Sequence, residues 1–205
     1  MMQVTGIRIE RGQQVLVDGL DFSVAAGNAL MLRGPNGSGK STLLRALLGL
    51  TPVQAGQIQW QDDRFAPGLC THALWLGHAH GLKGELSAID NLELLAGLDG
   101  TRPTRAQLRQ VLERVALGKR PNVETRRLSQ GQRQRLALAR LLLSPHRPLW
   151  LLDEPSAALD TEGSTLLDTL LEEHLDGGGS ALIATHLPVL AARQPAELWL
   201  RGNHA

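Results

Sequence analysis

Residues 32–42 read Leu-Arg-Gly-Pro-Asn-Gly-Ser-Gly-Lys-Ser-Thr, and this stretch predicts the architecture around it. It contains the pattern G-x-x-x-x-G-K-S. The apolar run 29–32 before it predicts a buried strand, and residues 40–50 after it predict a helix, because leucines recur there at helical spacing. Strand, loop and helix in this order are the context in which the pattern forms a phosphate-binding loop.

The residue types of this loop suit a nucleoside triphosphate. Glycines let the backbone turn its N–H groups toward an anion, next to the positive end of the following helix. Lys40 is expected to contact the β- and γ-phosphates, and the hydroxyl of Ser41 is expected to bind Mg²⁺. A glycine turn before an ordinary helix is the alternative, and the complete pattern argues against it. The predicted nucleotide-binding residues are Gly34, Pro35, Asn36, Gly37, Ser38, Gly39, Lys40, Ser41 and Thr42.

Length and composition set limits on the remaining functions. The chain has 205 residues and a net charge of +1, from 21 basic and 20 acidic side chains, so neither sign of charge dominates. Cys70 is the one cysteine, which excludes an internal disulfide. No apolar run approaches the ~20 residues that cross a bilayer. We therefore expect a single domain over residues 1–205, without direct nucleic-acid contact and without a transmembrane segment of its own.

Further along the chain, strands and helices alternate. Residues 3–10 and 15–24 predict antiparallel strands, with Gly12 and Gly19 at turns. Four tryptophans in strand-like runs, Trp199 among them, are expected in the core. Strands that alternate with helices around a phosphate loop favour an α/β fold with a mostly parallel sheet. The other predicted strands are 57–60, 74–76, 149–152, 181–184 and 198–200, and the predicted helices lie within 87–118, 129–143 and 161–175.

A second set of candidate residues follows the apolar run 148–152. Asp153 is predicted at the carboxyl end of its strand, where α/β sheets bind ligands, and is expected to hold Mg²⁺ through water. Glu154 points elsewhere and is expected to accept a proton from the attacking water. Without the phosphate loop, the same pair could equally be solvated acids at the end of a strand.

The start of the helix at 129–143 has two interpretations. Ser129-x-x-Gln132 predicts a capping box, as Thr104-x-x-Gln107 does for another helix. Alternatively, Ser129 and the backbone of Gly131 form a second anion site at the helix N-terminus. The glycine, which leaves the backbone open to a phosphate, favours the second interpretation.

A histidine ends the next apolar strand. His186 follows residues 181–184, a strand that we expect beside the one that carries Asp153. This position predicts that His186 faces the γ-phosphate.

These segments together resemble the ATPase domain of ATP-binding-cassette proteins. Residues 34–42, 128–132, 151–155, 156–160 and His186 match its motifs in order. The resemblance implies a P-loop NTPase with a RecA-like parallel core, an antiparallel β subdomain and an inserted helical subdomain at roughly 80–145. It also implies ATP hydrolysis with Mg²⁺ by a head-to-tail homodimer. Each ATP then lies between the phosphate loop of one copy and Ser129, Gln130, Gly131 and Gln132 of the other, with Asp160 in the D-loop.

A narrower resemblance is carried by Leu-Trp-Leu-Gly-His at 74–78, Gly-Leu-Lys at 81–83 and Pro-Leu-Trp-Leu-Leu-Asp-Glu-Pro at 148–155. These three segments are similar to those of the haem-exporter ATP-binding subunits of c-type cytochrome biogenesis. This implies a peripheral protein on the cytoplasmic face of the bacterial inner membrane, acting with separate integral membrane subunits to release a haem-loaded chaperone. The alternatives are the ATPase of another small-cargo exporter, a soluble cassette ATPase that acts on ribosomes or DNA, and a nucleotide-gated structural partner.

The sequence departs from the cassette pattern at two positions. The glutamine usual between the sheet and the helical subdomain falls at Ala79 or His78, so His78 or His80 is the candidate to act through water. The aromatic residue that usually stacks on adenine is absent, and Arg11 occupies that stretch. A guanidinium can stack on a base, so we expect Arg11 to contact the base with loose specificity.

Overall fold

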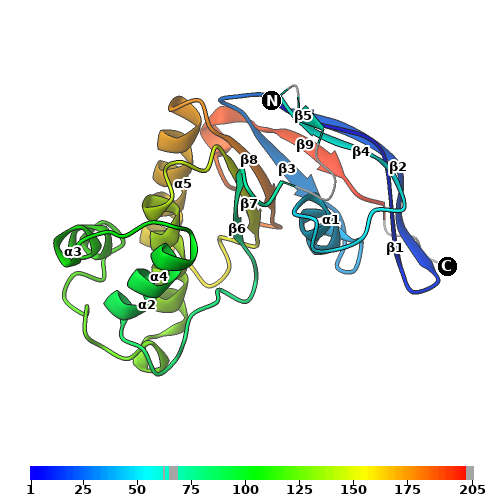
Figure 1. Ribbon diagram of the computed structural model, residues 1–205. Helices are drawn as coiled ribbons and strands as arrows, with labels where there is room; N and C mark the ends of the chain where they lie inside the picture. Colours follow the sequence, from blue (N-terminus) through cyan, green and yellow to red (C-terminus); the bar gives the residue numbers. More distant parts are fainter. Residues whose placement is uncertain (62, 65–68, 202–205) are drawn as a thin grey trace.

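The computed structural model describes residues 1–61, 63–64 and 69–201 (Figure 1). A parallel sheet lies between an antiparallel sheet and a lobe of helices (Figure 1). The fold class predicted from the sequence, a mostly parallel core with an antiparallel subdomain and a helical subdomain, is confirmed.

The parallel sheet has the strand order β6-β7-β8-β3-β9, and all its neighbouring strands are parallel. Except for the edge strand β9, its strands are short apolar runs, as expected for a sheet covered on both faces. Because parallel strands end at one edge of the sheet, the loops after them come together there. The strands are β3 (Ala29–Arg33), β6 (Ala73–Leu76), β7 (Leu149–Asp153), β8 (Ser180–Ala184) and β9 (Ala196–Trp199).

The antiparallel sheet has the order β2-β1-β4-β5. Its two long strands form the predicted hairpin, which turns at Gly12 with a φ of 64°. The strands are β1 (Met2–Arg11), β2 (Gln14–Val24), β4 (Ala55–Trp60) and β5 (Asp63–Arg64).

The parallel sheet separates two apolar cores. Along β7, Leu149 and Leu151 face the core that contains helix α1 (Lys40–Leu47) and the antiparallel sheet. Trp150 and Leu152 face the opposite core, which helices α4 (Gln130–Leu143) and α5 (Thr161–Asp176) cover. This alternation follows from the two-residue period of a strand.

A third core lies inside the helical lobe, which projects from one side of the molecule (Figure 1). Helices α2 (Ala88–Leu98) and α3 (Arg105–Arg114) pack there against α4. Helix α4 belongs to two cores, because Leu138 packs under the sheet whereas Leu136 packs inside the lobe. The lobe is thus connected to the sheet through α4. Short 3-10 helices span Thr125–Arg127 and Ala191–Arg193.

Four sequence predictions need correction. The helix predicted over 40–50 ends at Leu47, because Gly49 takes a positive φ of 78°. Gly19, expected at a turn, lies within β2 where its register with β1 shifts. The last strand covers 196–199 rather than 198–200. Trp199, expected in the core, is 65% exposed, because β9 is an edge strand.

Candidate functional site

The phosphate loop connects β3 to α1 and folds around the side chain of Lys40. Its Nζ donates hydrogen bonds to the carbonyl oxygens of Gly34 at 2.8 Å and Pro35 at 3.1 Å, and the residue is 8% exposed. Gly34 has a φ of 143°, and a Cβ added there would lie 2.5 Å from the carbonyl oxygen of Leu200. The loop therefore requires glycine at this position, and it holds an ammonium group among backbone carbonyls.

A cavity of about 470 Å³ opens over this loop. Its volume falls within the range of small-molecule sites. The cavity brings together residues from the first hairpin, the phosphate loop and the end of β7. Its described lining residues are Arg11, Gln14, Leu16, Asn36, Gly37, Gly39, Lys40, Ser41, Thr42, Asp153 and Glu154. Of the predicted loop residues, Gly34 and Pro35 act instead as acceptors for Lys40, and Ser38 is buried.

Two carboxylates lie at the end of β7, with Asp153 as its last residue and Glu154 in the turn that follows. Glu154 has a φ of 52°, which is unusual for a residue with a side chain, and its N–H donates to the carbonyl oxygen of Ala184 at 2.7 Å. Such a conformation costs on the order of 1–3 kcal/mol and persists only where the surroundings impose it. Both residues line the phosphate-loop cavity, and the predicted difference in direction between their side chains stays a prediction.

His186 lies between the phosphate loop and Glu154. Its Nε2 is 3.3 Å from Nζ of Lys40, 3.1 Å from Oδ1 of Asn36 and 3.5 Å from Oε1 of Glu154. The strand before it, β8, is paired with β7, which confirms the predicted neighbourhood. One imidazole nitrogen therefore lies among the groups expected around a γ-phosphate.

Asp153 and Ser41 present oxygen atoms that fit a divalent cation. Asp153 is 6% exposed, and no ion pair is found for its carboxylate within the described residues. A buried carboxylate without a partner is costly, and hard oxygen ligands suit Mg²⁺. The described part of the chain holds no cluster of three or more acidic, histidine or cysteine side chains that could bind a metal.

The start of α4 forms the predicted capping box. Oγ of Ser129 accepts from the N–H of Gln132 at 3.2 Å, and Oε1 of Gln132 accepts from the N–H of Ser129 at 3.0 Å. Gly131 packs against the turn after β7, where a Cβ added to it would lie 3.0 Å from the carbonyl oxygen of Ala158. None of residues 129–132 is among the described residues that line the phosphate-loop cavity of the same chain.

Asp160 joins α4 to α5. Its Oδ1 caps α5 by accepting from the N–H of Gly163 at 2.9 Å, and its Oδ2 pairs with Arg135 of α4 at 2.8 Å. This contact fixes the turn after β7 against the start of α4.

The sequence patterns did not predict two side-chain contacts near Glu154. The buried side chain of Gln134 donates from Nε2 to the carbonyl oxygen of Pro155 at 2.6 Å, and Oγ of Ser156 lies 3.0 Å from Oγ1 of Thr185. A polar residue among the apolar positions of a helix was the available signal for Gln134. Both contacts brace the turn that carries Glu154.

Glu154 also lines a smaller cavity of about 240 Å³. The stretch after β6 contributes His78 and His80 to it, and the described remainder of its lining is Gln130, Arg133, Gln134 and Ala157. Burial lowers the pKa of His80, and the neighbouring charges of His78 and Arg133 lower it further. The imidazole of His80 is therefore neutral at pH 7.

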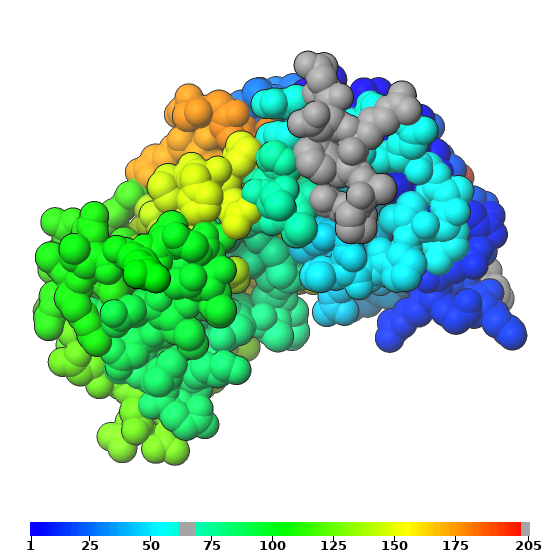
Figure 2. Space-filling model, in the orientation of Figure 1, coloured from blue at the N-terminus to red at the C-terminus, as the bar shows by residue number. Residues whose placement is uncertain are grey.

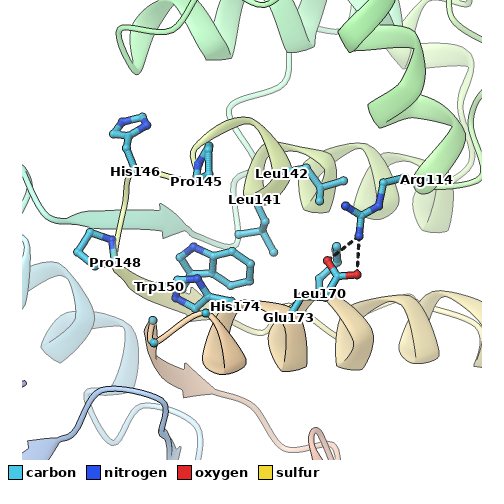
Figure 3. Close-up of a pocket in the computed structure, with 13 residues that line it drawn as sticks. Arg114, Leu141, Leu142, Pro145, His146, Pro148, Trp150, Leu170, Glu173 and His174 are labelled. Atoms are coloured by element: carbon cyan, nitrogen blue, oxygen red, sulfur yellow. Dashed lines mark hydrogen bonds and ion pairs between the residues drawn. The ribbon is translucent and has the colours of Figure 1, made fainter.

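The overall surface is recessed between the helical lobe and the antiparallel sheet (Figure 2). A separate cavity of about 480 Å³ lies between α4 and α5 and contains no predicted site residue (Figure 3). Among its lining residues, Trp150 and His174 stack with ring centroids 3.8 Å apart, and Arg114 forms an ion pair with Glu173 (Figure 3). Burial lowers the pKa of His174.

Comparisons with known proteins agree with this geometry. A family model described as "ABC transporter" matches residues 17–157. The cytochrome c biogenesis ATP-binding export protein CcmA of Xanthomonas oryzae pv. oryzae (strain MAFF 311018) is 45% identical over 91% of this chain and 86% of its own length. A solved ATP-binding subunit of an ABC transporter superposes with a TM-score of 0.84 at 25% identity, covering 98% of this chain and 87% of the other.

A dimeric ATP-binding cassette in a post-hydrolysis state, bound to ADP and Pi, has the same fold. Its TM-score is 0.81 at 23% identity, and the match covers 100% of this chain and 97% of that one. Among the helices in the described part of the chain, none has the length and apolar character to span a membrane.

Proposed function

The chain belongs to the ABC transporter family, and we propose that it is the ATP-hydrolysing subunit of a transporter complex in cytochrome c biogenesis. The 45% identity to a cytochrome c biogenesis export protein supports this assignment over another small-cargo exporter. The observation that carries the proposal is the cavity in which Lys40, Ser41, Asp153 and Glu154 lie together. The whole chain, 1–205, acts as one ATPase domain, and its helical lobe lies at roughly 80–145.

ATP binds with its phosphates in the loop. Lys40 exchanges its bonds to the carbonyls of Gly34 and Pro35 for bonds to the β- and γ-phosphate oxygens. Ser41 and, through water, Asp153 hold Mg²⁺, which neutralises phosphate charge when bound. Arg11, on the first hairpin, lines the same cavity, and its guanidinium contacts the base.

Hydrolysis follows from the placement of Glu154 and His186. The water oxygen forms a bond to the γ-phosphorus while the bond from that phosphorus to the bridging oxygen of ADP breaks, and the water proton passes to the Glu154 carboxylate. His186, 3.3 Å from Lys40 and 3.5 Å from Glu154, donates a hydrogen bond to the γ-phosphate. The products are ADP and inorganic phosphate.

Two copies of the chain form a head-to-tail homodimer around two ATP molecules. Residues Ser129–Gln132 are outside the phosphate-loop cavity of their own chain, and they complete the site of the other copy. A cassette of the same fold is dimeric, which supports this arrangement. The dimer binds separate integral membrane subunits at the cytoplasmic face of the bacterial inner membrane, without direct nucleic-acid contact.

Co-purification tests the proposal. A tagged chain, expressed in bacteria that make c-type cytochromes, is recovered from detergent-solubilised membranes, and its partners are identified by mass spectrometry. We expect integral membrane subunits and ATP hydrolysis that depends on Mg²⁺. Recovery with ribosomes or DNA, and without a membrane subunit, would contradict the proposal and favour the soluble cassette class.

A further inference from the structure

The smaller cavity connects the stretch after β6 to the hydrolytic centre. Because β6 pairs in parallel with β7, through Leu76 and Leu152, the residues that follow both strands emerge at the same edge of the sheet. His78 and His80 therefore come to lie in one cavity with Glu154, although the sequence separates them widely. Glu154 lines both this cavity and the phosphate-loop cavity.

The cavity has room for water and groups to orient it. Its volume of about 240 Å³ exceeds the roughly 30 Å³ that one liquid water molecule occupies. Oε1 of Glu154 lies 3.5 Å from Nε2 of His186, which is not among the described lining residues of this cavity. Besides Glu154 and Ala157, the described lining consists of polar residues, namely His78, His80, Gln130, Arg133 and Gln134.

His80 is the better placed of the two histidines. His78 is exposed, whereas His80 is half-buried, so the surroundings restrict its ring. The charged or titratable groups that share its cavity are His78, Arg133 and Glu154. A neutral imidazole offers one donor and one acceptor, which is what a bridge through water to a carboxylate requires.

We propose that His80 is a positioning residue for hydrolysis, which holds the attacking water against Glu154 in a cassette that lacks the usual glutamine. This inference rests on the proposed ATPase function. The stretch that carries His80 also leads into α2, and α4 supplies the opposite wall of the cavity. A movement of the helical lobe therefore changes the position of His80 and Glu154 relative to the water.

The test compares His80→Ala with His80→Gln. We expect His80→Ala to lower kcat about tenfold or more, because a misplaced reactant costs rate, while KM and the Kd for ATP stay within about twofold. Glutamine also carries a donor and an acceptor, so His80→Gln should recover most of the lost kcat. The matched control is His146→Ala, a histidine at the separate cavity between α4 and α5, which should hydrolyse ATP at the wild-type rate.

The pH profile of kcat gives an independent readout. Protonation removes the acceptor of His80, so the wild-type rate should fall on the acid side, and this fall should shift to lower pH in His80→Gln. Wild-type kcat in His80→Ala, an equal loss in both His80 variants, or an unchanged profile in His80→Gln would overturn the proposal. If His80→Ala does not fold, the kcat of His80→Gln and its pH profile test the proposal instead. A wild-type chain that binds but never hydrolyses ATP would instead refute the proposed ATPase function.

Discussion

At the scale of single residues, Glu154 has the most constrained position. Its backbone has a positive φ of 52°, and the hydrogen bond from its N–H to the carbonyl oxygen of Ala184 fixes the turn. Gln134 braces the next peptide through the carbonyl of Pro155. A carboxylate held at this turn, 3.5 Å from Nε2 of His186, is placed to serve as the proposed base.

The first prediction concerns that base. Glu154→Gln should bind ATP with normal affinity but release phosphate about 100-fold more slowly or worse, because an amide cannot accept the proton. Single-turnover phosphate release, measured beside the ATP Kd, checks this. Glu93→Gln, an exposed acid in the helical lobe, is the control and should hydrolyse ATP normally. Unchanged turnover in Glu154→Gln would exclude Glu154 as the base.

The second prediction concerns the ammonium group in the loop. Lys40→Ala removes charge-assisted bonds to phosphate worth about 1.5–3 kcal/mol, so the Kd for ATP should rise about 10- to 100-fold. Equilibrium binding of ATP measures the effect. Lys119→Ala, at an exposed loop position, should leave the Kd unchanged. Normal affinity in Lys40→Ala would contradict the role of Lys40.

At the scale of elements, the start of α4 has a structural role and a proposed functional role. The capping box of Ser129 and Gln132 stabilises the helix within its own chain. A second capping box, formed by Thr104 and Gln107, begins α3. The two boxes share their geometry, but only the first contains a glycine, Gly131, which packs against the turn after β7.

A comparison of variants at the two capping boxes separates helix capping by Ser129 from its proposed contact with ATP. Ser129→Ala and Thr104→Ala should each lower the free energy of unfolding by about 1 kcal/mol, the usual cost of a lost cap. If Ser129 also contacts ATP held by the partner, its variant alone should lose ATP hydrolysis. Chemical denaturation and ATPase assays measure both quantities. Equal hydrolysis by the two variants would leave Ser129 with capping alone.

The contact between α5 and β7 predicts a pH dependence of stability. His174 stacks on Trp150, and burial lowers its pKa in the folded state. The unfolded chain therefore binds a proton first as the pH falls, so this site destabilises the fold below about pH 6.5 and has no effect above it. His174→Phe keeps a ring on Trp150 and should flatten the fall of unfolding free energy between about pH 6.5 and 5. An unchanged slope would contradict the prediction.

At the scale of the whole molecule, α4 connects the lobe to the sheet, and the ion pair between Arg114 and Glu173 joins α3 to α5. In one copy of the chain, Ser129 is exposed, and residues 129–132 are not among the described residues that line the phosphate-loop cavity. We propose that they contact the ATP bound by a second copy.

The last prediction concerns this proposed dimer. Glu154→Gln with ATP and Mg²⁺ should elute as a dimer in size-exclusion chromatography with light scattering, because slow hydrolysis preserves the shared ligand. The same variant with ADP should elute as a monomer. Adding Ser129→Ala to Glu154→Gln should abolish the dimer. A persistent dimer in that double variant would exclude Ser129 from the interface.

The sequence by itself determined the features that depend on near neighbours. The phosphate loop, both capping boxes and the hairpin at Gly12 follow from residues within a few positions of one another, because turns, caps and periodicity are local properties. The adjacency of β7 and β8 was also predicted, since parallel α/β sheets follow few connection rules.

Only the tertiary structure decided which distant residues meet. The strand order placed β9 at an edge and so exposed Trp199, which its apolar neighbours had suggested was buried. The same order brought His80 to Glu154, and helix packing brought Gln134 to Pro155. These contacts depend on the arrangement of whole elements, and no local spacing in the chain encodes that arrangement.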